Sequence, residues 1–314
     1  MVSAALAARP QLEPPPALAP VPRRTEIALR DVSVAYPCER RESKTVLSGI
    51  DLEIAAGEFV VVLGETGCGK STLLRLILGE ELPTRGSVLV DGKPVTSVDS
   101  RCGYVPQKYS LFPDRTVIGN VMYGPENAQS GLLGRWRPSF RRYRRNLRDR
   151  ARGSLERMGL RAQDFSKYPH QLSGGMQQRV AIAQALLMRP PVLLMDEAFS
   201  ALDPSTRSRL QEQLHAIWFE SRPTILFVTH NTQEALLLGT RLLLLGRYSD
   251  ENRRNSNILL YMENPLARLP FARRAQSPEL HRIQDQVRQV AFAASSMCGA
   301  EDPVEFASPE SLSQ

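Results

Sequence analysis

The feature that most restricts the fold is a glycine-rich turn placed directly after a run of apolar residues. The run FVVVL, residues 59–63, is apolar throughout, which is typical of a strand covered on both faces. It is followed by GETGCGKST, residues 64–72, and then by the helical pattern LLRLIL. A strand, a turn of this spacing and a helix form the context of a phosphate-binding loop. We therefore expect an α/β core that presents this loop.

The turn has the chemistry that a polyphosphate requires. Its glycines let backbone N–H groups point inward around phosphate oxygens, and the helix N-terminus adds its dipole. Lys70 can reach the β- and γ-phosphates, and the Ser71 hydroxyl can bind Mg²⁺. The candidate nucleotide-binding residues of the turn are Gly64, Glu65, Thr66, Gly67, Cys68, Gly69, Lys70, Ser71 and Thr72. A chance glycine-rich turn that contains Lys-Ser is the alternative, and the full spacing with both flanks argues against it.

A second apolar run ends in two carboxylates. In PVLLMDEAFSALD, residues 191–203, four apolar residues bring Asp196 to the carboxyl end of a buried strand. Open α/β sheets bind ligands at that end of their strands. Asp196 can hold Mg²⁺ through water, and Glu197 can reach a water that attacks the γ-phosphate. An acidic strand end without a catalytic role is the alternative, and the neighbouring phosphate loop makes it weaker.

The order of strand and helix patterns predicts the fold class. Strand patterns occupy residues 27–37, 44–64, 87–95, 191–197, 224–230, the end of 235–246, and 257–262. A helical, arginine-rich stretch runs from about 108 to 170, and a last helical pattern lies at 279–293. This order predicts a phosphate-loop NTPase core of the α/β class, with a mainly parallel sheet, an antiparallel β portion and a helical subdomain.

We divide the chain into three parts. Residues 1–25 are expected to be a disordered leader rich in Pro and Ala, 26–250 a nucleotide-binding domain with its helical subdomain at about 108–180, and 251–314 a C-terminal extension. No run of about 18 apolar residues is present that would span a bilayer. The four cysteines, Cys38, Cys68, Cys102 and Cys298, lack metal-binding spacing and are interpreted as free thiols in a reducing compartment.

The stretch LSGGMQQRVAIAQAL, residues 172–186, has a Ser and two Gly before a helical pattern. A chain builds an anion site at a helix N-terminus in this way. Yet no Lys or Arg lies beside Ser173, Gly174 and Gly175 to bind a phosphate, and a complete phosphate loop occurs elsewhere in the chain. The residues alone do not explain this second turn.

The chain resembles the nucleotide-binding subunit of an ATP-binding cassette (ABC) transporter over roughly residues 26–246. LSGGMQQ is similar to the signature sequence of that family, and the other motifs occur in the family's order. The resemblance implies that the signature turn, with Ser173, Gly174 and Gly175, closes over the γ-phosphate of ATP held on a partner cassette.

The resemblance also implies roles for single residues. Tyr36 matches the aromatic residue that stacks on adenine, and Gln107 matches the glutamine that meets Mg²⁺ and water at the hinge to the helical subdomain. Asp203 matches the loop that touches the partner cassette, and His230 matches the switch histidine that contacts the γ-phosphate. An ordinary strand tyrosine and a structural histidine are the alternatives. Asn231 departs from the family, which often has Asp after the histidine.

Charge adds a further constraint. The chain has a net charge of +7 and a pI near 9.5, which favours an acidic partner such as a membrane surface or nucleic acid. Residues 134–152 hold nine Arg against one acidic residue, Asp149. Contact with lipid headgroups or with the cytoplasmic loops of a membrane subunit is one interpretation, and a solvated face is the other. Nucleic acid is less favoured, because no aromatic platform accompanies the arginines.

The resemblance implies a function. We expect an ATPase subunit of an ABC importer that binds ATP and Mg²⁺, pairs with a second identical or related cassette, and lies at the cytoplasmic face of the inner membrane. An integral membrane permease, and through it a periplasmic solute-binding protein, are the implied partners. LFPDRTVIGNV and THNTQEALLL resemble the nitrate/sulfonate/taurine importer branch. The alternatives are a cytosolic ABC ATPase that acts on ribosomes or nucleic acid, and the cassette of an exporter or lipid-extraction system.

Overall fold

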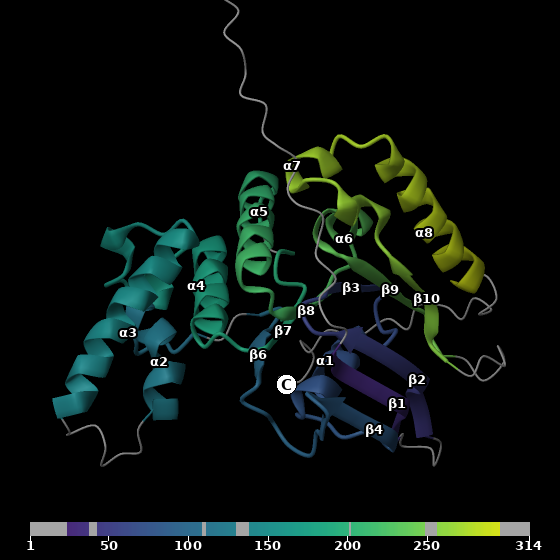
Figure 1. Ribbon diagram of the computed structural model, residues 1–314, viewed down its shortest axis with the longest axis horizontal. Helices are drawn as coiled ribbons and strands as arrows, with labels where there is room; N and C mark the ends of the chain where they lie inside the picture. The colour runs from purple at the N-terminus through teal and green to yellow at the C-terminus, as the bar shows by residue number, and fades with distance from the viewer. Residues whose placement is uncertain are drawn as a thin grey trace, which may run out of the picture.

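The computed structural model describes residues 24–37, 43–108, 111–129, 138–200, 202–248 and 256–295. The leader expected at residues 1–25 lies outside these ranges apart from its last two residues, and Cys38 and Cys298 also lie outside them. Figure 1 shows two sheets with their helices on one side and a group of helices on the other.

The strand before the phosphate loop lies inside a six-stranded sheet with the order β10-β9-β3-β8-β7-β6. The strands are β3 (Phe59–Gly64), β6 (Cys102–Val105), β7 (Val192–Asp196), β8 (Thr224–Val228), β9 (Arg241–Leu245) and β10 (Ile258–Glu263). All neighbours pair in parallel except β10, which runs antiparallel to β9. The expected mainly parallel sheet is confirmed.

The second sheet is antiparallel and has the order β2-β1-β4-β5. Its strands are β1 (Thr25–Pro37), β2 (Ser43–Ala55), β4 (Arg85–Val90) and β5 (Lys93–Pro94). Asp91 and Gly92 join β4 to β5, and their φ angles of 51° and 70° lie in the left-handed region that a two-residue hairpin turn requires. The expected antiparallel portion and its hairpin are confirmed.

The central strands are apolar throughout because both faces are covered. Val60 and Val62 of β3 pack in one core with helix α1 (Lys70–Leu78) and the antiparallel sheet. Phe59 and Val61 point to the other face, into a core with α5 (Pro204–Ser221) and α6 (Thr232–Leu238). Alternation along a strand sends neighbouring side chains to opposite faces, so a strand between two cores needs an apolar residue at every position.

A helical group lies to one side of the sheets (Figure 1). It consists of α2 (Val117–Gln129), α3 (Pro138–Arg157) and α4 (Gly174–Leu187), with 3₁₀ turns at Ala162–Asp164 and Pro169–Gln171. Leu147, Ala151 and Leu155 of α3 recur every four residues and are buried, so they form the stripe that packs inward. Among the described residues, no helix has the length and apolar character needed to cross a membrane.

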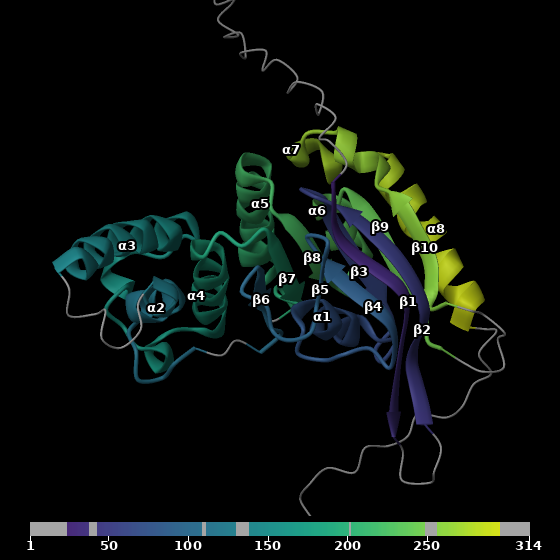
Figure 2. The same cartoon turned by 60° about the horizontal axis from the view of Figure 1, so that its bottom comes forward.

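The chain after β9 returns to the core. Strand β10 is followed by a 3₁₀ turn (Pro265–Arg268), α7 (Phe271–Arg274) and α8 (Glu279–Ser295). Leu280, Ile283 and Val287 of α8 are buried in the core that α6 also lines, and Figures 1 and 2 both show α8 beside β10. The strand expected at 257–262 and the helix expected at 279–293 are confirmed. The division of the chain at residue 250 stays a prediction.

A buried arginine attaches this last part to the core. Arg274 is 3% exposed. Its guanidinium donates to the carbonyl oxygens of Leu237 at 2.6 Å, Leu269 at 3.1 Å and Ala267 at 3.1 Å. Burial lowers the pKa of Arg274 to about 10. The hydrogen bonds compensate the cost of burying the charge and join α7 to the carboxyl end of α6.

Replacement of Arg274 by Met should reduce the free energy of unfolding by about 3 kcal/mol, because three partly buried carbonyl groups lose the donor that the buried guanidinium supplies. Arg273→Met is the matched control, since Arg273 is the exposed neighbour on the same helix. Urea unfolding monitored by circular dichroism measures both. Equal stability of the two variants would contradict the structural role given to Arg274.

Candidate active site

The phosphate loop lies between the end of β3 and the start of α1. Gly69 caps α1 with a φ of 100°, which is a left-handed conformation. A Cβ atom at this position would come within 2.6 Å of a methyl group of Leu47. Both the backbone conformation and the close approach of the antiparallel sheet therefore require glycine here. The loop can then turn its N–H groups inward, as its sequence predicts.

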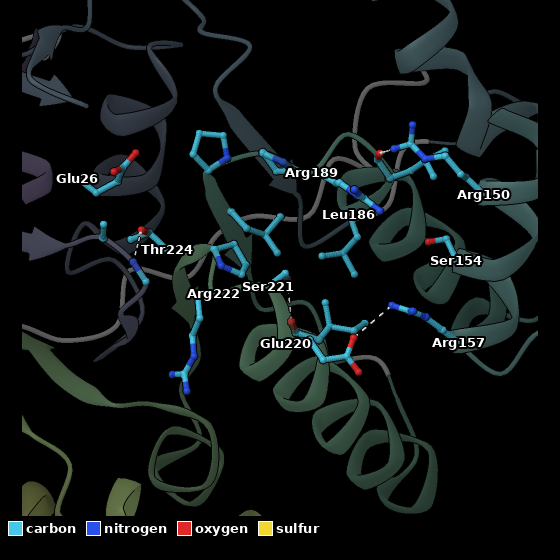
Figure 3. A pocket seen from close by; sticks show the side chains of 18 of the residues that line it. Glu26, Arg150, Ser154, Arg157, Leu186, Arg189, Glu220, Ser221, Arg222 and Thr224 are labelled. Atoms are coloured by element: carbon cyan, nitrogen blue, oxygen red, sulfur yellow. Dashed lines mark hydrogen bonds and ion pairs between the residues drawn. The ribbon is translucent and has the colours of Figure 1, made fainter. Parts of the chain in front are cut away.

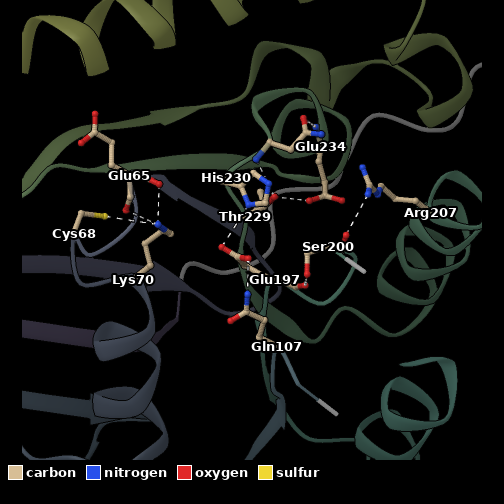
Figure 4. Close-up of polar contacts among 12 residues, drawn as sticks. Glu65, Cys68, Lys70, Gln107, Glu197, Ser200, Arg207, Thr229, His230 and Glu234 are labelled. Carbon is tan, nitrogen blue, oxygen red and sulfur yellow. Dashed lines mark hydrogen bonds and ion pairs between the residues drawn. The ribbon is translucent and has the colours of Figure 1, made fainter. Parts of the chain in front are cut away.

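Lys70 places its charge inside this loop. Its ammonium group donates to the carbonyl oxygens of Gly64 and Glu65, each at 2.7 Å, and the residue is 7% exposed. Figure 4 shows the side chain directed toward Glu65 and Cys68. Burial raises the pKa of the Cys68 thiol, which favours the neutral form. The fixed cation at the mouth of the loop suits an anionic phosphate chain.

Ser71 and Asp196 meet although they are far apart in the sequence. Ser71 is the second residue of α1, Asp196 ends β7, and the Ser71 hydroxyl lies close enough to the Asp196 carboxylate to influence its pKa. Burial raises the pKa of Asp196, and the Ser71 hydroxyl opposes that shift. A hydroxyl and a carboxylate are oxygen donors of the kind that Mg²⁺ takes from proteins beside substrate phosphates. These two residues fit the magnesium site that the sequence predicts.

Glu197 lies at the centre of a group of polar side chains. Its carboxylate accepts from the Nε2 of Gln107 at 2.9 Å, and its other oxygen lies 3.4 Å from the Nδ1 of His230 (Figure 4). The three residues follow β6, β7 and β8. Glu197 has a φ of 43°, a conformation that non-glycine residues adopt only when the surroundings impose it. The structure therefore brings together the three candidate catalytic residues.

The loop that carries His230 is anchored by a buried carboxylate. Glu234 is 6% exposed and accepts from Gln211 Nε2 at 2.8 Å and from Thr229 Oγ1 at 2.5 Å. Burial raises its pKa. The sequence interpretation missed Glu234 and Gln211. An acidic residue three positions after the cap residue Asn231 is a capping-box signal that could have pointed to Glu234, but its burial depends on α5.

Asn231 has a structural role that explains the departure from the family pattern. Its Oδ1 accepts from the backbone N–H of Gln233 at 2.9 Å and of Glu234 at 3.2 Å, so it caps α6. Asn and Asp are similarly good cap residues. The helix after His230 therefore keeps its cap with Asn in place of Asp.

Asp203 caps α5 in the same manner. Its carboxylate accepts from the Ser205 hydroxyl at 2.6 Å and from the Thr206 N–H at 2.9 Å, and these bonds hold its pKa well below the usual range. Arg207, which sequence reasoning also missed, donates to the carbonyl oxygens of Phe199 at 3.2 Å and Leu202 at 2.9 Å. The segment between Glu197 and α5 is thereby held to its own helix.

Ser173 and Tyr36 occupy two different surroundings. Ser173 is exposed and caps α4, accepting from the Met176 N–H at 3.4 Å. No hydrogen bond in the described ranges joins Ser173, Gly174 or Gly175 to residues 64–72. Tyr36 lies near the end of β1, and its hydroxyl is close enough to Glu81 and Thr72 for both to influence its pKa, so it does lie beside the loop. The structure thus groups Tyr36 with the phosphate loop and leaves the signature turn apart from it.

The site combines a phosphate loop, a buried carboxylate and a second carboxylate held by Gln107 and His230. This combination defines a phosphate-loop ATPase. The chain belongs to the ABC transporter family, whose family model matches residues 47–200. It is 40% identical over 264 residues to the aliphatic sulfonates import ATP-binding protein SsuB of Burkholderia ambifaria. That alignment covers 83% of this chain and 72% of SsuB. It is 41% identical to the bicarbonate transport ATP-binding protein CmpC of Synechococcus elongatus over 219 residues, 70% of this chain and 31% of CmpC.

The fold also matches solved structures. The ATP-binding cassette MJ0796, in a dimeric post-hydrolysis state bound to ADP and Pi, aligns with a TM-score of 0.63 at 30% identity. The alignment covers 76% of this chain and 98% of that one. The protein is an ATP-binding ATPase of the ABC transporter type, as the sequence predicts, and it has the expected phosphate-loop α/β fold. The roles of the single site residues stay predictions.

Replacement of Glu197 by Gln tests the central residue of the group. If its carboxylate orients the attacking water, hydrolysis should fall by about 10²- to 10⁴-fold, the range for loss of a general base. MgATP binding should remain near the wild-type level, because the phosphate loop is intact. Steady-state phosphate release and equilibrium binding of ATP measure the two effects. Glu212→Gln on the exposed face of α5 is the control, and near-normal hydrolysis by Glu197→Gln would reject the role.

Proposed function

We propose that this chain is the ATP-hydrolysing subunit of an ABC importer. Two cassettes hold two MgATP molecules between them, and hydrolysis drives an integral membrane permease. The observation that supports this most is the meeting of Gln107, Glu197 and His230 at one sheet edge. The signature turn at Ser173 is exposed, and within the described ranges no hydrogen bond joins it to the phosphate loop of its own chain. A turn of that kind is suited to a second cassette.

The residues divide the work of hydrolysis. Lys70 and the loop N–H groups bind the phosphate chain, and Tyr36 packs on the base. Glu197 takes the proton of the attacking water as the water approaches the γ-phosphorus, and Gln107 and His230 hold the carboxylate in position. Ser71, Gln107 and Asp196 would hold Mg²⁺, which neutralises charge on the phosphates when bound. Ser173, Gly174 and Gly175 bind the γ-phosphate on the partner, and Asp203 lies at the contact between the cassettes.

The import direction is supported by the names of the relatives. SsuB is named for import of aliphatic sulfonates and CmpC for bicarbonate transport. Because those names specify different solutes, we name none for this chain. In the proposed importer this chain lies at the cytoplasmic face of the inner membrane, on an integral permease that a periplasmic binding protein meets from the other side. The alternatives are the cassette of an exporter and an ATPase that acts on ribosomes. Identification of the bound partner distinguishes them from an importer subunit.

The arginine-rich helix α3 suits the membrane side of this assembly. Arg141, Arg142, Arg145, Arg148, Arg150 and Arg152 are exposed. In the described part of the chain, no carboxylate lies in an ion pair with any of these six, whereas Arg144 pairs with Glu126 at 2.8 Å. A basic surface of this kind is attracted to anionic lipid by about 1 kcal/mol per residue near the surface.

Copurification from membranes tests the proposal. Affinity-tagged chain, solubilised from its own membranes, should retain an integral membrane subunit and a second cassette. We expect weaker membrane association, with hydrolysis by the isolated chain intact, when Gln replaces Arg141, Arg142, Arg144 and Arg145 together. Added salt should weaken the membrane association of the wild type. The control variant has Gln in place of Arg268, Arg273, Arg282 and Arg288, which removes the same number of positive charges outside α3.

Two outcomes would contradict the proposal. Recovery of ribosomal or nucleic-acid partners in place of a membrane subunit would reject the transporter assignment. Equal membrane association of the two quadruple variants would show that α3 is a solvated face.

A further inference from the structure

A cavity of about 800 Å³ lies between the helical group and the central sheet. Its walls are the second half of α3, the end of α4, the end of α5 and the first residues of β7 and β8. Figure 3 shows Arg150, Ser154 and Arg157 on one wall and Glu220 and Ser221 on another. The volume is in the range of pockets that hold small organic molecules.

The cavity is separate from the nucleotide site. The site residues lie at the carboxyl ends of β7 and β8 and at the amino end of α4. The residues that line the cavity lie at the opposite ends of these three elements. Leu187 and Thr224, for example, end α4 and begin β8. A molecule in the cavity therefore cannot touch the phosphate loop.

The charges around the cavity favour an anion. Four arginines and two glutamates line it. Arg157 lies 3.5 Å from Glu220, and Arg222 stacks over the Trp218 ring at 4.2 Å. Arg150 donates to the Leu187 carbonyl oxygen at 3.2 Å. Within the described ranges, neither Arg150 nor Arg189 has a carboxylate in an ion pair. Two guanidinium groups thus remain able to bind an acid group.

Much of the remaining lining is apolar. Leu186, Leu187, Leu193 and Ile217 contribute side chains, together with Pro190, Pro191 and Pro223. The hydroxyls of Ser154 and Ser221 donate to the carbonyl oxygens of Ala183 and Ile217 and so have their donors satisfied. A ligand with an apolar body and one acid group matches such a surface, whereas a cation or a fully polar sugar does not.

We propose that this cavity is a binding site for a small organic anion, held by Arg150 and Arg189 through its acid group and by the leucines and prolines through its apolar body. The site belongs to the single chain and does not depend on the importer assignment. Its occupant would contact both the helical group and the sheet, since residues of α3, β7 and β8 all line the cavity.

Gly153 allows the cavity to be blocked without a change in charge. Gly153 lies on α3 and lines the cavity, and a Cβ atom added there would meet nothing within 4 Å. Leu at this position should project into the cavity, and it favours helix more than glycine does, so folding is not threatened. Gly153→Ala is the matched control, because a methyl group leaves most of the cavity open.

The experiment measures binding of naphthalene-1-sulfonate to the full chain by isothermal titration calorimetry, with the nucleotide site saturated by MgADP. We expect one site per chain and at least tenfold weaker binding of the neutral naphthalene-1-methanol. Arg150→Gln with Arg189→Gln should weaken sulfonate binding by about tenfold or more, the effect of losing charge-assisted hydrogen bonds. Arg148→Gln with Arg152→Gln removes the same charge from α3 outside the cavity and should bind as the wild type does.

Gly153→Leu should also lose most of the binding, and Gly153→Ala should keep it. Absence of saturable binding to the wild type would overturn the proposal. So would equal binding of the neutral alcohol, equal weakening by the two arginine pairs, or full binding by Gly153→Leu. Melting temperatures of all variants identify any that fail to fold, and the two Gly153 variants decide the question without loss of an arginine.

Discussion

The parallel pairing of β3, β8, β7 and β6 is the constraint on which the site depends. Val62 of β3 lies opposite Val228 of β8, which in turn lies opposite Asp196 of β7, and Met195 lies opposite Val105 of β6. The loops that follow these strands therefore leave the sheet at one edge. Lys70, Asp196, Glu197, His230 and Gln107 meet there because of this register. A slip of one residue would turn every side chain of the shifted strand to the opposite face of the sheet.

Polar contacts then connect the loops to the helices behind them. Glu234 ties the His230 loop to Gln211 of α5, and Arg207 holds the carbonyl groups of the segment between Glu197 and Asp203. Helix α5, which Asp203 caps, thus contacts both the loop that follows Glu197 and the loop of His230. Buried, fully hydrogen-bonded groups of this type hold a loop in one conformation.

The sequence predicts those parts in which local pattern and burial agree. The apolar runs of FVVVL, PVLLMDE and TILFVTH reflect strands covered on both faces, so the strands and a mainly parallel sheet could be inferred from them. The meeting of Asp196 with the phosphate loop follows from the same rule. The burial of Glu234 and Arg274 could not be predicted, because a charged residue on a short helix is usually exposed and only the neighbouring elements show that these two are buried. The cavity beside α3 is likewise formed by segments distant in the sequence.

The central claim is that each hydrolytic site combines Lys70 of one chain with Ser173 of another. Lys70→Ala and Ser173→Arg should each be inactive alone, and a mixed dimer should contain one site with both residues intact. Hydrolysis by the isolated mixed dimer is the measurement. The positive control is a dimer of a wild-type chain with a Lys70→Ala chain, because it keeps one intact site whichever chain supplies Ser173. The account predicts that the mixed dimer matches that control. An inactive mixed dimer beside an active control would show that Lys70 and Ser173 serve the same chain's ATP.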